Sequence, residues 1–109
     1  MDQTILFDEF KRLQLVIARI IDIWEHPNAD KLYVLKIDIG GQEKQLVAGI
    51  RGSYTKEELK DRQIVVVNNL TTAMIRGEKS EGMLLAVSDE KGISLIGPDR
   101  VVQLGSPVR

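Results

Sequence analysis

The chain contains no cysteine, a single histidine and few aromatic residues. Without cysteine, disulfides, thiolate nucleophiles and zinc-finger sites are excluded. A lone histidine without a paired carboxylate motif offers no catalytic machinery, so we expect neither an enzyme nor a cofactor. No apolar run approaches the ~18 residues of a membrane span, and the first residues do not resemble a secretion signal. We therefore expect a cytoplasmic protein without membrane contact.

The numbers of positively and negatively charged residues are nearly equal. Fifteen Lys and Arg residues oppose sixteen Asp and Glu residues, for a formal net charge of −1. Strong non-specific nucleic-acid binders gain most of their affinity by neutralising phosphates, so any such function must depend on local positive charges and on shape. The 109 residues, of which 43% are hydrophobic, predict one folded domain over residues 1–109.

Hydrophobic spacing predicts a mainly β protein. Residues 5–13 suggest a short amphipathic helix that caps one end of a barrel, with Phe7 and Phe10 in its core. Residues 15–24 predict a long, bent strand. Alternation in residues 32–39 predicts a half-buried strand, which Gly40–Gly41 joins in a hairpin to residues 43–48.

The second half of the chain continues this pattern. A capping box from Thr55 to Glu58 begins a helix over residues 55–60. Residues 64–68, 83–87 and 93–96 are predicted strands, and residues 101–109 form an extended tail. The order of three strands, a helix and further strands is typical of the OB-fold, a five-stranded barrel that binds ligands through its loops L12 and L45. Here L12 is residues 26–31 and L45 is residues 69–80.

Both loops are polar, and most of the candidate RNA-binding residues lie in or beside them. His26 either bonds a phosphate or ribose or simply stabilises its turn. Lys31, Lys36 and Lys44 either form a positive stripe beside L12 or are ordinary exposed strand residues. Scarce aromatics favour a folded RNA recognised by shape over a stacked single strand. The candidates are His26, Asn28, Lys31, Lys36, Lys44, Asn69, Arg76, Lys79, Ser80 and Met83.

Four candidates lie within the second half of L45 and the strand after it. Arg76 and Lys79 flank Gly77, where a phosphate could be met. Ser80 has no evident reason to lie in a core. Met83 fits a core position better than a contact, although both interpretations stay open.

Several motifs together resemble the tRNA-binding domain that is appended to methionyl-tRNA synthetases and that also occurs as free-standing homodimers. They include HPNADKLY at residues 26–33, LVAGI at 46–50, VVVNNL at 65–70, IRG at 75–77 and SEGMLLA at 80–86. The resemblance implies dimerisation through the added helix and C-terminal segment, and contact with the outer corner of tRNA with little sequence preference. It implies backbone or sugar contacts for Asn28, Lys31, Arg76, Ser80 and Met83. The implied partners are tRNA, a second copy of the chain and a methionyl-tRNA synthetase.

One departure from the family pattern affects affinity. Members usually carry Lys-Pro-x-Lys before the Arg-Gly pair, whereas this chain has TTAM at residues 71–74. Two positive charges are therefore missing, and we expect weak to moderate affinity, supported by avidity in a dimer. The alternative function is that of a dimeric chaperone-like protein of the same superfamily, which binds unfolded peptides. Its secretion-related members lack the NADKL pattern, so this alternative ranks lower.

Overall fold

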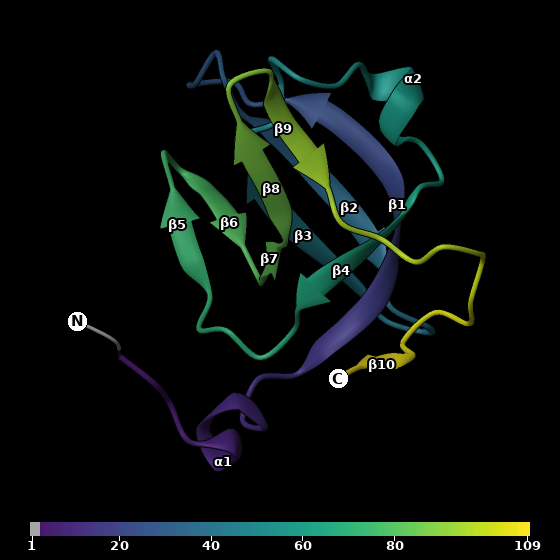
Figure 1. Ribbon diagram of the computed structural model, residues 1–109. Coiled ribbons are helices and arrows are strands. Elements are labelled where there is room, and N and C mark those ends of the chain that lie inside the picture. The colour runs from purple at the N-terminus through teal and green to yellow at the C-terminus, as the bar shows by residue number, and fades with distance from the viewer. Residues whose placement is uncertain (1–2) are drawn as a thin grey trace.

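The computed structural model describes residues 3–109 and consists mainly of antiparallel strands around one barrel (Figure 1). The sheet order β3-β2-β1-β4-β7 confirms the predicted all-β OB-fold, and β5-β6 and β8-β9 form two further hairpins. The elements are α1 (Phe7–Phe10), β1 (Leu15–Glu25), β2 (Tyr33–Asp38), β3 (Glu43–Ala48), α2 (Lys56–Leu59), β4 (Gln63–Val67), β5 (Ala73–Ile75), β6 (Glu78–Ser80), β7 (Met83–Leu84), β8 (Ala86–Asp89), β9 (Gly92–Leu95) and β10 (Pro107–Val108).

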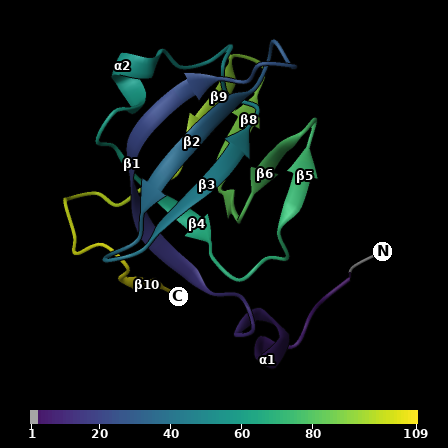
Figure 2. The ribbon, with the colours of Figure 1, turned by 180° about the vertical axis from the view of Figure 1, so that it is seen from behind.

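Strand β1 is long enough to pair with three neighbours, β4, β2 and, at its first residues, β10. Its first half pairs with β4 and its second half with β2, and the register to β2 shifts between Ile20 and Asp22. Such a bulge increases twist and lets a strand bend, which allows β1 to wrap around the barrel (Figure 2). The predicted bend of this strand is therefore correct.

One hydrophobic core fills the barrel. Alternate residues of the curved strands point inward, among them Ile20, Leu35, Leu46 and Ile64, each at most 1% exposed. Helix α2 adds Leu59, which is fully buried in the same cluster. The capping box of α2 forms as predicted.

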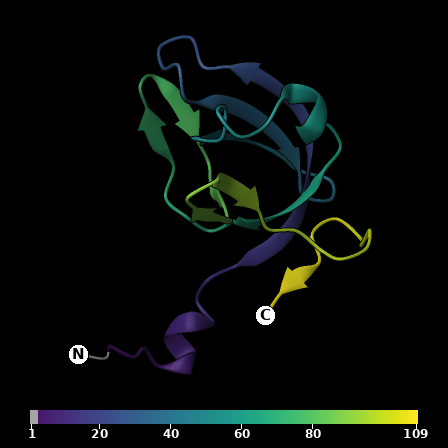
Figure 3. The same cartoon turned by 45° about the horizontal axis from the view of Figure 1, so that its top comes forward.

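Helix α1 does not cap the barrel, contrary to the prediction from its spacing. It spans only Phe7–Phe10 and contains no buried residue, and it stands away from the strands in two views (Figures 1 and 3). Phe7 is 69% exposed and Phe10 is only partly buried, so neither belongs to the barrel core. The helical spacing correctly indicated an apolar surface, but this surface finds no partner within residues 3–109.

The predicted long loop L45 is also more regular than expected. Most of it forms the β5-β6 hairpin, in which Ala73 pairs with Ser80 and Ile75 with Glu78. At the tip, Arg76 and Gly77 both have positive φ angles, 51° and 93°, as a type I′ turn requires. The predicted strand over residues 83–87 is divided between β7 and β8, because Leu85 interrupts it.

Side chains close the barrel between β3 and the segment that follows β6. The backbone N–H of Glu81 donates to the carbonyl oxygen of Gln45 at 2.7 Å, and a Glu81 carboxylate oxygen accepts from the Gln45 N–H at 3.0 Å. One residue earlier, the Ser80 hydroxyl accepts from the N–H of Val47 at 3.1 Å and lies 3.1 Å from the Gly82 carbonyl oxygen. Ser80 is 3% exposed, so the expectation that it has no place in the interior is wrong.

The C-terminal segment returns across the barrel to its base. Gly40 and Gly105, both with positive φ, lie at a close backbone approach: a Cβ on Gly105 would come within 2.6 Å of the Ile39 carbonyl oxygen. Farther along, β10 pairs with the first residues of β1. Within the described part of the chain, no helix has the length and apolar character needed to span a bilayer.

Candidate nucleic-acid interface

Loops L12 and L45 meet at one end of the barrel, as a binding site formed by both loops requires. The His26 ring nitrogen Nε2 lies 2.9 Å from the carbonyl oxygen of Ile75, and the Asn28 side-chain amide donates to the carbonyl oxygen of Arg76 at 3.3 Å. Both acceptors belong to the β5-β6 hairpin. Figures 1 and 2 show the tip of this hairpin beside the connection from β1 to β2.

His26 lies inside this junction and not on its surface. The residue is 4% exposed, and its Nδ1 atom accepts from the backbone N–H of Asn28 at 2.9 Å. Because both ring nitrogens have protein partners, neither remains for a phosphate or ribose. The structure therefore agrees with the interpretation of His26 as a turn-stabilising residue, and not with a direct contact to phosphate or ribose.

Exposed polar groups surround the junction. Asn28, Lys31 and Arg76 are all exposed, and they come from the two loops that His26 connects. Among residues 3–109, neither Lys31 nor Arg76 takes part in an ion pair. Their charges are therefore available to an anionic ligand at this end of the barrel.

The predicted positive stripe along β2 and β3 does not form. Lys36 pairs with Gln45 across the strands and Lys44 pairs with Ile37, so the two lysines lie on opposite faces of the sheet. Lys36 is 4.0 Å from the Glu43 carboxylate, and the Lys44 ammonium donates to the Asn68 carbonyl oxygen at 3.0 Å. Neither lysine contributes a free charge to the junction.

The remaining candidates are divided between structural and exposed roles. Both side-chain amide atoms of Asn69 bond the backbone that follows α1: Oδ1 accepts from the Gln14 N–H at 2.8 Å and Nδ2 donates to the Arg12 carbonyl oxygen at 2.6 Å. Lys79 is 4.0 Å from the Glu81 carboxylate. Met83 is 40% exposed and therefore not a core residue.

The sequence did not reveal the acceptors of the hydrogen bonds that His26 and Asn28 donate to L45. The acceptors in the junction are the backbone carbonyls of Ile75 and Arg76, and a backbone carbonyl has no residue-specific signature. On the other side of L12, the backbone N–H of Arg51 donates to the Lys31 carbonyl oxygen at 3.4 Å, while the Arg51 guanidinium pairs with Glu25 at 3.1 Å. L12 is thus held from both sides, which gives its exposed side chains a defined position.

A small OB-fold barrel with two joined, polar loops at one end defines a class of binding modules for polar ligands. The sequence comparisons agree with this class. A family model described as "Putative tRNA binding domain" matches residues 15–107. The chain belongs to this family of tRNA-binding domains.

Curated relatives and solved structures resemble this domain in sequence and in fold. The chain is 47% identical over 107 residues to the methionine–tRNA ligase of Pyrococcus furiosus and 48% identical over 103 residues to that of Pyrococcus abyssi, but it spans only 15% and 14% of their lengths. A MetRS-related protein from Pyrococcus horikoshii has a TM-score of 0.91 at 28% identity, with 99% of this chain and all of that chain covered. The CsaA chaperone protein from Picrophilus torridus also has a TM-score of 0.91, at 27% identity, with 97% and 100% covered.

Proposed function

We propose that this chain is a structure-specific tRNA-binding module in which residues 1–109 act as one unit. The observation that carries the proposal is the junction of L12 and L45, where Lys31 and Arg76 are exposed and form no ion pair with the described part of the chain. Membership of the tRNA-binding domain family supplies the nature of the polynucleotide. A role in protein synthesis would place the protein in the cytoplasm.

The mode of recognition follows from the groups that the junction offers. Lysine and arginine side chains suit phosphates, and the carboxamide of Asn28 suits sugar hydroxyls, so contacts go to the RNA backbone. Few aromatic side chains are present in the whole chain, which disfavours base stacking. Such an interface distinguishes the shape of a folded RNA and reads little of its sequence.

The test is a titration of the purified protein against total tRNA and against an unstructured RNA of similar length. We expect tRNA to bind more tightly, and we expect the double substitution Lys31→Ala with Arg76→Ala to weaken tRNA binding by about tenfold or more. A matched control, Arg19→Ala with Arg100→Ala, removes the same charge from exposed positions outside L12 and L45. Equal effects of the two double variants would show that only net charge matters and would refute the proposed interface.

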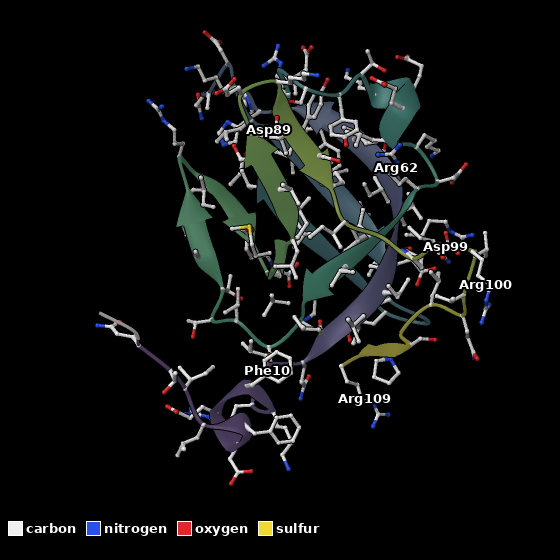
Figure 4. The ribbon with its side chains drawn as sticks, in the orientation of Figure 1. Phe10, Arg62, Asp89, Asp99, Arg100 and Arg109 are labelled. Carbon is white, nitrogen blue, oxygen red and sulfur yellow. The ribbon has the colours of Figure 1, made fainter. Side chains whose placement is uncertain are left out.

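We further propose that two copies associate through the base of the molecule. An apolar hollow of about 540 Å³ lies between α1, the start of β1 and β10, where Phe10 and Arg109 occupy the same end of the molecule (Figure 4). Phe7, which lines the hollow, is 69% exposed, and the neighbouring Leu6 is 71% exposed. A second copy would cover this exposed apolar surface.

Light scattering tests the dimer directly. Phe7→Glu should halve the mass in solution, because a carboxylate in an apolar interface loses its hydration without gaining a partner. Val87→Glu is the matched control, since Val87 is also exposed, at 54%, but lies on β8 outside this hollow. A wild-type protein that is monomeric at micromolar concentration would refute the proposal.

We propose that the tRNA is delivered to a methionyl-tRNA synthetase acting in trans, since the curated relatives named above are methionine–tRNA ligases that this chain matches over a small part of their length. Co-sedimentation with a synthetase that lacks such a domain would test this. The second candidate function is binding of unfolded peptides, which the similarity in fold to the CsaA chaperone protein from Picrophilus torridus favours. Suppression of client aggregation without any tRNA binding would establish that function in place of the first.

A further inference from the structure

Among residues 3–109, His26 is the one buried side chain that hydrogen-bonds across the two loops of the proposed site. Its partners assign the state of its ring, because Nδ1 faces a backbone N–H, that of Asn28, and so must accept. Nε2 faces the carbonyl oxygen of Ile75 and so must donate. The ring is thus a neutral imidazole with its proton on Nε2, donating to L45 and accepting from L12.

Few other contacts fix the tip of the β5-β6 hairpin. At the base of the hairpin, the Gln45 carboxamide donates to the Lys79 carbonyl oxygen at 2.8 Å and Ser80 bonds to β3. Nearer the tip, the side-chain bonds to L12 are the buried one from His26 and the longer, exposed one from Asn28 at 3.3 Å. The Ile75 carbonyl that His26 holds directly precedes Arg76, so this bond sets where the Arg76 side chain begins.

We propose that His26 is a positioning residue for tRNA binding: without touching RNA, its ring holds Arg76 on L45 in register with Lys31 and Asn28 on L12. This inference rests on the proposed function. Groups that are held in their binding arrangement before the ligand arrives lose less entropy on binding, so the connection between the loops raises affinity. The two loops otherwise come from distant parts of the chain and could move independently.

Two amide substitutions separate the two bonds of the ring. His26→Asn places an acceptor near the position of Nδ1 and keeps the turn within L12, but it is too short to reach Ile75. His26→Gln places a donor near the position of Nε2 and keeps the connection to L45. We expect His26→Asn to weaken tRNA binding about fivefold, the equivalent of one net hydrogen bond, and His26→Gln to stay within about twofold of wild type.

The salt dependence distinguishes positioning from contact. Because both variants keep the cationic side chains of Lys31 and Arg76, they should keep the wild-type slope of log affinity against log salt, whereas complete loss of one cationic contact, such as that of Arg76, would reduce it by about 0.9. Equal tRNA affinity for His26→Asn and wild type would overturn the inference. So would a stronger loss in His26→Gln than in His26→Asn.

A measurement on the wild type keeps the inference testable if a variant fails to fold. The ¹⁵N shifts of the imidazole report which ring nitrogen carries the proton, and we expect the neutral Nε2–H form with and without total tRNA. A large change in these shifts on RNA binding would mean that the ring itself meets the ligand, against the inference. If wild type binds no tRNA, the proposed function fails, while the ¹⁵N shifts still decide whether the ring holds the two loops together.

Discussion

Replacing Ser80 by alanine separates a structural role from the RNA contact that the family resemblance implies. The hydroxyl accepts from the Val47 N–H, and Val47 is itself only 3% exposed, so the substitution leaves a buried donor without a partner. Such a group costs about 1–3 kcal/mol. We therefore expect Ser80→Ala to lower the free energy of unfolding by about 2 kcal/mol. At roughly 4 °C per kcal/mol for a domain of this size, Tm should fall by about 8 °C.

The assay is thermal unfolding followed by calorimetry, combined with a tRNA titration at 25 °C. Affinity should stay within about twofold of wild type, since the buried hydroxyl cannot reach a ligand and the domain remains folded at that temperature. Ser88→Ala, at an exposed position on β8, is the matched control and should change neither quantity. An unchanged Tm together with a tenfold loss of affinity in Ser80→Ala would refute this reasoning and restore Ser80 as a contact.

Three further predictions concern charge, packing and pH. Thr71→Lys with Met74→Lys should raise tRNA affinity and steepen its salt dependence, as measured by titration at several salt concentrations, because both positions are exposed on the L45 side. Gly82→Ala should destabilise by about 2 kcal/mol in urea unfolding, since its Cβ would lie 2.8 Å from a backbone oxygen of β4. Hydrogen bonds from Thr55 lower the pKa of Glu58 below that of a free glutamate side chain. The resulting stability is present above the unfolded-state pKa and is lost as pH falls through the folded-state pKa, so Glu58→Gln should flatten this loss in unfolding curves measured at acid pH.

The fold was predictable where the sequence acts locally. Alternation in the strands, the glycine pair at residues 40–41 and the capping box of α2 each depend on neighbours within a few residues, and each forms as predicted. Helix α1 differs because amphipathic spacing indicates that a face is apolar without indicating what covers it. The β5-β6 hairpin was missed for another reason: its turn places Arg76 at a positive φ that Asn or Asp adopts more readily.

The position of the candidate site could be predicted from the sequence, but the roles of its individual residues could not. The motifs correctly located L12 and L45, which lie together as the OB-fold requires. The roles of His26 and Ser80 depend on bonds to backbone atoms 49 and 33 residues away, and such partners leave no mark in the sequence. Polar residues in a functional loop thus divide into those that build the loop and those that face the ligand, and burial decides between them.

The salt dependence of tRNA binding counts the cationic side chains that contact phosphates. If Lys31 and Arg76 each contact one phosphate, as proposed, one copy of the chain makes about two such contacts, for a slope near −1.8 when each contact in base-paired RNA contributes about −0.9. Raising salt from about 50 to 200 mM would then weaken binding about 12-fold, and about 150-fold if both protomers of a dimer engage one tRNA. Phe7→Glu should therefore move the slope from the steeper value to the shallower one if the dimer binds as a unit. A slope near zero with affinity retained would mean that tRNA binds without phosphate contacts from Lys31 and Arg76, and it would refute the proposed interface.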